Sequence, residues 1–148
     1  MCIRDSHNWG FWKGVRWQWG QVADGDLSFV YGRIVPPPDV ADPDRVPGFL
    51  GVLGAKGALG FSTAVSLDEA GDERGVPERI TVRARGQTID LELVFSVDRS
   101  VRTAMSMTAA TPGSPIDFLQ LGGEYRVTGR VGDRAIGFTA RGAAETFR

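Results

Sequence analysis

The sequence has little of the chemistry that disulfides and metal centres require. It contains one cysteine, Cys2, and one histidine, His7. A single cysteine cannot form an internal disulfide, and these two residues cannot build a His/Cys metal cluster, so only a carboxylate site remains open to a metal. No Gly-x-Ser-x-Gly elbow, P-loop or dinucleotide-binding fingerprint occurs. We therefore expect no cofactor and no metal.

Charge of one sign and long apolar runs are also lacking. The net charge is -1, from 17 basic and 18 acidic residues, so no basic field exists to attract nucleic acid. No apolar run approaches the roughly 18 residues of a membrane-spanning helix. Only Lys13 and Lys56 are lysines, and a cation content dominated by arginine suits paired, partly buried charges. Nucleic acid and a membrane span are thus not expected partners.

The first six residues look foreign to the rest of the chain. Residues 1–6 (MCIRDS) resemble a short leader found at the start of reading frames from metagenomic assemblies, and they lack the apolar stretch of a signal peptide. We exclude them from the domain and expect residues 7–148 to form one domain whose natural N-terminal neighbour is missing. Localisation therefore cannot be inferred.

Several stretches alternate apolar and polar residues, which is the period of a β-strand. Residues 80–85 and 88–97 flank a Gly86-Gln87 turn. If the two segments form a hairpin, apolar residues lie opposite apolar residues and an arginine lies opposite an aspartate. The expected pairs are Ala84 with Ile89, Val82 with Leu91, Ile80 with Leu93, and Arg83 with Asp90. A turn at residues 98–100 is expected to start a third strand, with Met105 and Met107 on the same apolar face.

Further hairpins complete the expected fold. A Gly132-Asp133 turn joins residues 124–131 to 134–141, with Val127 facing Phe138 and Glu124 facing Arg141. Other expected strands are residues 15–22 and 27–34 around Asp24-Gly25, 49–53 and 59–67. Residues 36–48 hold five of the eight prolines and predict an extended loop. Eight or nine strands joined mostly by hairpins predict an all-β, lipocalin-like antiparallel up-and-down barrel, with a β-sandwich as the alternative.

An aromatic segment stands out near the N-terminus, because all four tryptophans and the histidine lie between His7 and Trp19. In the first hairpin Trp17 is expected opposite Gly32, where an aromatic ring can cover a cross-strand glycine. The other face carries five candidate ligand-facing residues: Arg16, Gln18, Phe29, Tyr31 and Arg33. Arg16 would oppose Arg33, and such a pair needs a carboxylate, an anionic ligand or full solvation.

Each of these residues also has a structural interpretation. Trp17 and Trp19 would pack in the core or barrel wall. His7 would hold a loop by hydrogen bonding, Tyr31 would be a hydrogen-bonded wall residue, and the two arginines would pair with carboxylates.

The stretch His7-Asn8-Trp9-Gly10, followed by a Trp-rich strand and Phe29-Val30-Tyr31-Gly32-Arg33, resembles the hydroxyneurosporene synthase (carotenoid hydratase) superfamily, which includes AttH-like proteins. The resemblance implies two lipocalin-like barrels in tandem, with this chain as the C-terminal barrel. In the hydratase branch a His-x-Trp pair and a Tyr-x-Asp pair are implied as catalytic. His7, Trp9 and Tyr31 match, but Arg33 stands in place of the aspartate. An arginine cannot protonate an alkene, which counts against carotenoid hydration.

Three functions follow as hypotheses. The first is binding of a hydrophobic small molecule, such as a prenyl lipid, a sterol or a polyketide-like compound, with Trp9, Trp12, Arg16, Gln18, Phe29 and Arg33 as ligand-binding residues. The second is an isomerase, cyclase or hydro-lyase acting on such a ligand, with His7 and Tyr31 as acid and base. The third is a structural half-module that packs on a missing N-terminal barrel.

Overall fold

The fold is one antiparallel sheet of nine strands. A computed structural model describes residues 15–71, 75–105 and 116–147. The strands are β1 (Arg16–Asp24), β2 (Leu27–Val35), β3 (Phe49–Gly54), β4 (Gly57–Ser62), β5 (Ala64–Gly71), β6 (Pro77–Arg85), β7 (Ile89–Met105), β8 (Ile116–Val131) and β9 (Arg134–Phe147). A short 3-10 turn, η1 (Pro43–Arg45), interrupts the proline-rich loop between β2 and β3.

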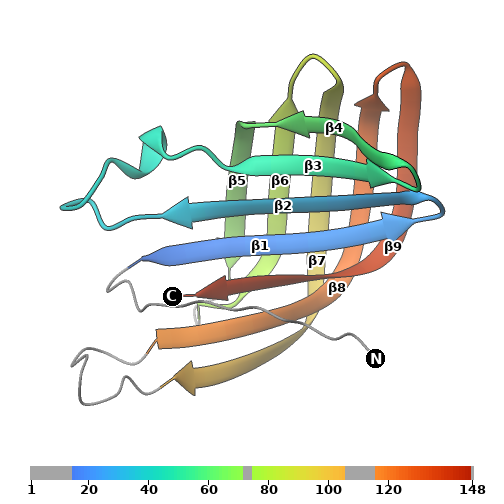
Figure 1. Cartoon of the computed structure of the whole chain (residues 1–148). Helices are drawn as coiled ribbons and strands as arrows, with labels where there is room; N and C mark the ends of the chain where they lie inside the picture. Colours follow the sequence, from blue (N-terminus) through green and yellow to red (C-terminus); the bar gives the residue numbers. More distant parts are fainter. Residues whose placement is uncertain (1–14, 72–74, 106–115, 148) are drawn as a thin grey trace.

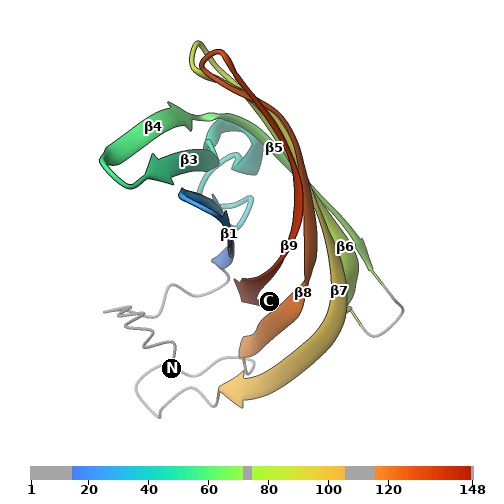
Figure 2. The ribbon, with the colours of Figure 1, turned by 90° about the vertical axis from the view of Figure 1, so that its right-hand side faces the viewer.

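The sheet curls into a nearly closed barrel (Figures 1 and 2). The strand order is β4-β3-β2-β1-β9-β8-β7-β6-β5, so the last strand pairs with the first and the open seam lies between the consecutive strands β4 and β5. This confirms the lipocalin-like up-and-down barrel, and a single curled sheet is not the two packed sheets of a sandwich. Within the described ranges, no helix is long and apolar enough to cross a membrane.

The C-terminal hairpin has the expected register. Val127 pairs with Phe138, Glu124 pairs with Arg141, and the turn is Gly132-Asp133. Gly132 has a φ of 55°, a value that glycine adopts without the clash that a Cβ would cause. A two-residue turn with such a glycine in its first position matches the twist of the strands it joins.

Two other hairpins occur where expected but with registers shifted by two residues. The first turn is Gly25-Asp26 rather than Asp24-Gly25, so Trp19, not Trp17, lies opposite Gly32, and Arg16 pairs with Val35 instead of Arg33. The turn after β6 is longer than two residues, because Arg85 pairs with Asp90. A shift of two leaves every side chain on the face that was predicted. The corrected pairs of this second hairpin are Ala84 with Leu91, Val82 with Leu93, Ile80 with Phe95 and Arg83 with Glu92.

The predicted turn at residues 98–100 is wrong. β7 continues for 17 residues through this region, and the register shifts between Val97 and Arg99. This is a β-bulge, in which one extra residue bends the strand without reversing it. Asp98, the extra residue, is an ion-pair partner of Arg141 on β9. Leu93 therefore faces Val127 of β8, and Met105 continues the same strand and pairs with Ile116. Met107 lies outside the described residues.

The predicted strand over residues 59–67 is two strands, because the chain bends at Thr63 between β4 and β5. The hydroxyl of Ser62 holds this corner: it donates to the backbone oxygen of Arg85 at 2.5 Å and accepts from the backbone N–H of Ala64 at 3.0 Å. Because of this bend, β4 and β5 lie on opposite sides of the seam although they are consecutive in the sequence.

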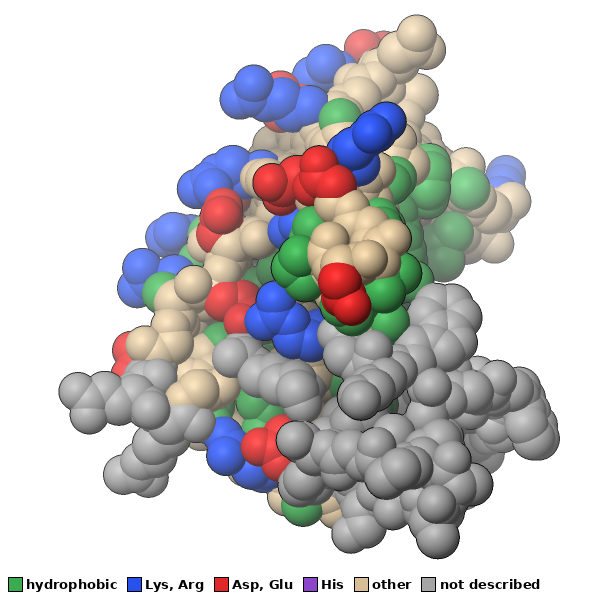
Figure 3. Space-filling view, turned by 90° about the vertical axis from the view of Figure 1, so that its left-hand side faces the viewer, with side chains coloured by type: hydrophobic (Ala, Val, Ile, Leu, Met, Phe, Trp, Pro, Cys, Tyr) green, Lys and Arg blue, Asp and Glu red, His purple; other side chains and the backbone are tan. Residues whose placement is uncertain are grey.

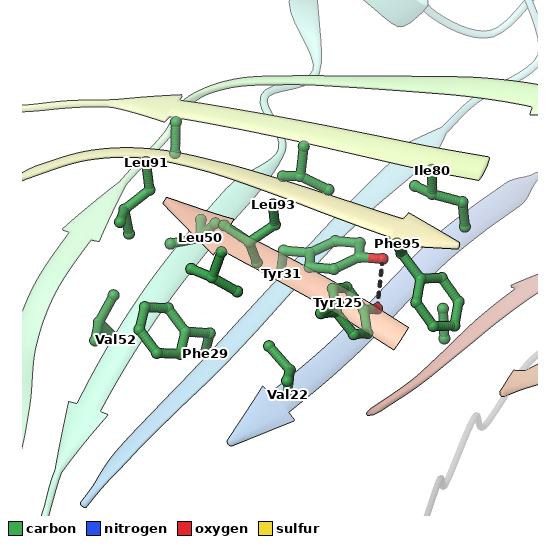
Figure 4. Close-up of a cluster of buried hydrophobic side chains, with 14 of the residues drawn as sticks. Val22, Phe29, Tyr31, Leu50, Val52, Ile80, Leu91, Leu93, Phe95 and Tyr125 are labelled. Carbon is green, nitrogen blue, oxygen red and sulfur yellow. Dashed lines mark hydrogen bonds between the residues drawn. The ribbon is translucent and has the colours of Figure 1, made fainter. Parts of the chain in front are cut away.

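The core fills the inside of the curl (Figure 4). Its largest side chains have relative exposures of 0–1%: Tyr31, Tyr125, Phe29, Phe95, Leu50 and Leu93. They come from four strands, β2, β3, β7 and β8. Their alternation with exposed residues on the same strands shows which face points inward. The interior of this small barrel is therefore packed with side chains, as in other barrels of similar strand number.

Candidate functional site

The packed interior opens into a cleft at the end of the barrel where β1 begins and β2 and β9 end. We call this the mouth cleft. Its volume is about 340 Å³, and its lining comes from β1, β2, β5, β9 and the η1 turn. Figure 3 looks at this end and shows basic and acidic side chains beside apolar ones. The lining residues used below are Arg16, Gln18, Arg33, Val35, Leu67, Glu69, Thr146 and Phe147.

The polarity of the mouth follows from where the interior positions of β1 fall. Val22 and Gly20 are buried inside the barrel, and the next interior positions toward the mouth are Gln18 and Arg16. On β2 the same progression runs from the buried Phe29 and Tyr31 to Arg33 and then Val35. Strand alternation thus carries two arginines and an amide to the mouth on the same face that packs the core.

A side-chain hydrogen bond spans the mouth cleft from β1 to β5. The Gln18 Nε2 donates to Glu69 Oε1 at 2.5 Å, across 51 positions of sequence. These strands lie on opposite sides of the curled sheet and do not pair with one another. A charge-assisted bond of this kind is stronger than a bond between neutral groups, and it helps to fix the width of the mouth.

Arg33 and Leu67 line both the mouth cleft and a second cleft of about 370 Å³, which lies between the β2–β3 loop and β5. The described carboxylate nearest to Arg33 is that of Asp44, at 3.7 Å. This distance is too long for a hydrogen bond, and the Asp44 side chain is 93% exposed whereas that of Arg33 is only 24% exposed. Solvent therefore screens most of this ion pair.

Two buried tyrosines, which we call the floor, lie just inside the mouth: Tyr31 is the next interior position of β2 after Arg33, and Tyr125 lies beside it. The Tyr31 and Tyr125 hydroxyls lie 3.0 Å apart, and the Tyr125 hydroxyl donates to the backbone oxygen of Ala143 at 3.1 Å. A tyrosine has one hydroxyl proton, so Tyr31 donates to Tyr125 and the chain of bonds ends at the carbonyl. Gly20 makes room for the pair, because a Cβ there would lie 2.4 Å from the Tyr31 hydroxyl and 2.6 Å from that of Tyr125.

Both phenols are held neutral. Burial raises the pKa of Tyr31 well above its ordinary value of 10.0, and the charge of Glu69 adds to the rise. Burial likewise raises the pKa of Tyr125. A phenol in this setting is a hydrogen-bond donor with little tendency to ionise. The assignment of Tyr31 as an acid or base stays a prediction, and its structural interpretation as a hydrogen-bonded wall residue matches the observed contacts.

The predicted site residues divide into three groups. Arg16, Gln18 and Arg33 lie together in the mouth cleft. Tyr31 lies in the floor, and Phe29 lies deeper, against Phe138 at a ring-centroid distance of 5.4 Å. The remaining three predicted residues, His7, Trp9 and Trp12, lie outside the described residues.

Sequence reasoning missed the β5 and β9 contributions to the mouth: Leu67, Glu69, Thr146 and Phe147. The signal for Leu67 and Glu69 was their spacing of two, which places them on one face of a strand. This spacing did not place the two residues at the mouth, because residues 59–67 were expected to form one strand. The position of β5 across the barrel depends on the corner at Ser62.

The outside of the barrel carries exposed apolar side chains over β2, β3 and β4. Phe49 and Phe61 stack with ring centroids 6.2 Å apart, and Phe61 is 59% exposed. Phe49 also covers Gly32, since a Cβ there would lie 2.7 Å from its ring. The predicted packing of an aromatic ring over Gly32 therefore exists, with Phe49 in place of Trp17. Trp17 lies half-buried against Phe147 instead, at 5.3 Å.

Among the described residues, no group of three or more His, Cys, Asp or Glu side chains could hold a metal ion. No protein-family model matches the chain, and no curated protein matches it either.

Proposed function

We propose that this chain is a binding barrel for a hydrophobic small molecule, which it holds in the mouth cleft. The observation that carries the proposal is a cleft of about 340 Å³ directly above a fully packed core. Its lining sets the apolar side chains of Val35, Pro43 and Leu67 beside five polar or charged residues, so the ligand that it suits has an apolar part and at least one polar group.

The size of the cleft limits the ligand. Small-molecule sites span about 300–1,000 Å³, so the mouth cleft belongs to the lower end of this range. Below it Tyr31, Phe29 and Leu93 are each at most 1% exposed, so their side chains already occupy the interior next to the cleft. The ligand is accordingly a compact ring system or one end of a longer apolar chain. The resemblance to carotenoid hydratases favours a prenyl lipid, with sterols and polyketide-like compounds as related choices.

A titration with Nile red, an uncharged fluorescent probe of apolar sites, tests the proposal. We expect saturable binding to the chain and its loss in Val35→Trp, because the indole fills the cleft. Val101→Trp is the matched control, since Val101 is 59% exposed on β7 and does not line the cleft. A second control, Phe61→Ser, removes the exposed ring on the outside. Binding that survives Val35→Trp and is lost in Phe61→Ser would contradict the proposal.

The exposed outer face supports a second candidate function, packing against another domain such as the N-terminal barrel that the same resemblance implies. Phe61, Leu59 and Leu53 are 59%, 46% and 45% exposed, and apolar patches of this kind mark interaction surfaces. We expect the chain to associate in solution and Phe61→Glu to reduce the association, as measured by light scattering. Val101→Glu is the control. A monomer at high concentration would count against this candidate.

A further inference from the structure

We propose that the ligand of the mouth cleft carries a carboxylate, which Arg16 and Arg33 bind together. This inference rests on the proposed function and specifies the chemical class of the ligand. It starts from an imbalance of charge: the cleft contains two arginines and one acidic side chain, Glu69.

The two arginines are neighbours on the inner face of the first hairpin. Arg16 pairs with Val35, and Gln18 pairs with Arg33, so the arginines occupy diagonal positions of adjacent strands. Diagonal neighbours in a sheet are about 7–8 Å apart at the backbone, within the reach of long side chains. Two guanidinium groups on such positions repel one another unless solvent or an anion lies between them, and an anion that both can reach is therefore favoured.

The described residues do not supply that anion. Arg16 is exposed and forms no ion pair within the described part of the chain. Arg33 has only the screened contact with Asp44, at 3.7 Å. The carboxylate of Glu69 accepts a hydrogen bond from Gln18. Both guanidinium groups thus retain N–H donors for a ligand.

The arrangement of polar and apolar lining residues in the cleft suits an acid that also has an apolar body. Guanidinium groups bind carboxylates through paired, parallel hydrogen bonds. The arginines come from the first residue of β1 and the end of β2, whereas Leu67 comes from β5 on the other side of the opening. A ligand whose carboxylate binds the arginines would direct its apolar body toward Leu67.

The test compares retinoic acid with retinol, which share one apolar body and differ in charge. Binding is followed by quenching of the intrinsic tryptophan fluorescence. We expect the chain to bind the acid at least tenfold more tightly than the alcohol, and this preference to shrink as salt is added. Arg33→Gln and Arg16→Gln should each weaken acid binding severalfold and leave retinol binding unchanged. Arg126→Gln is the control, because Arg126 is an exposed arginine of β8 outside the cleft.

The outcomes separate this inference from the proposed function. Equal affinities for the two retinoids, unaffected by either arginine substitution, would overturn the inference that the ligand carries a carboxylate. The proposed binding function would not be affected. If the protein binds Nile red but neither retinoid, the inference that the ligand carries a carboxylate would also be overturned. A folded protein that binds none of the three probes would overturn the proposed function and this inference together.

Discussion

The two ends of the barrel interior are built from the same strands and differ sharply in chemistry. In the deep part, Phe29, Leu93 and Val82 are at most 1% exposed and belong to the cluster of buried hydrophobic side chains. At the mouth, the same faces of β1 and β2 present Gln18, Arg16 and Arg33. The difference shows that one set of strands both stabilises the fold and lines the mouth cleft, with the tyrosine pair as the boundary between the two parts.

The largest effect is expected deep in the core, from Leu93→Ala. Leu93 is fully buried, and removing a buried leucine side chain costs about 2–5 kcal/mol through lost burial and the cavity left behind. Denaturant unfolding measures the loss. Val101→Ala, at a 59% exposed position of the same strand, should change the free energy of unfolding by less than about 0.5 kcal/mol. Equal effects of the two substitutions would mean that the core is not packed as described.

The next effect is expected at the boundary, from Gly20→Ala. The added methyl group would lie 2.4 Å from the Tyr31 hydroxyl, so that the tyrosine pair must shift, at a cost of about 1–3 kcal/mol. Gly137→Ala is the matched control, because a Cβ on this exposed β9 glycine meets nothing within 4 Å. If Gly20→Ala were as stable as Gly137→Ala, the glycine would not be needed for the pair.

A smaller effect is expected from Tyr31→Phe, which removes the hydrogen bond to Tyr125 and costs about 1 kcal/mol. Both tyrosines have pKa values raised by burial, so the neutral phenols stabilise the fold at neutral pH. Above about pH 10 the unfolded chain ionises first, and stability falls as the pH rises further. Removing one of the two phenols should make this fall less steep.

The alkaline titration can be read directly from phenolate absorbance. The chain has only two tyrosines, both of them in the pair, so no exposed phenol obscures the measurement. We expect phenolate absorbance to rise only when the protein unfolds, well above pH 10. A titration near pH 10 in folded protein would contradict the buried setting of the pair.

The smallest effect on stability is expected at the mouth, from Gln18→Met. The substitution keeps the length of the side chain and removes the hydrogen bond to Glu69, which should cost about 1 kcal/mol or less because Gln18 is only partly buried. Ligand binding should change more than stability does, since the bond helps to set the width of the opening. A loss of stability as large as that of Leu93→Ala would remove the distinction between the mouth and the core.

The sequence predicts the fold class and which residues share a face, because a period of two determines both, but not which face of the first hairpin points inward. It predicts registers only where the turn is correctly identified. Gly25-Asp26 and Gly132-Asp133 are turns of the same composition, with Gly25 and Gly132 at φ values of 57° and 55°. The first was misplaced because Asp24-Gly25 is the commoner turn dipeptide. The bulge at residues 97–99 was mistaken for a turn for a similar reason, since both features favour polar residues.

The candidate site is less accessible to sequence reasoning. Arg16, Gln18 and Arg33 share a face of one hairpin, and the alternation of β1 and β2 is enough to group them. Leu67 and Glu69 join them only because the chain turns a corner at Ser62 and the sheet then curls until β5 lies across the mouth. Such long-range closure depends on the twist of all nine strands, and no local pattern encodes it.

The most direct test of the account is to map the binding of retinol onto the backbone by NMR. Retinol is uncharged, so the result does not depend on the two arginines. We predict the largest amide shift changes, saturating with ligand, at residues 16–18, 33–35, 67–69 and 146–147. Changes centred on the deep core, at Val52, Val82 and Leu91, or on the outer ring of Phe61, would contradict binding at the mouth.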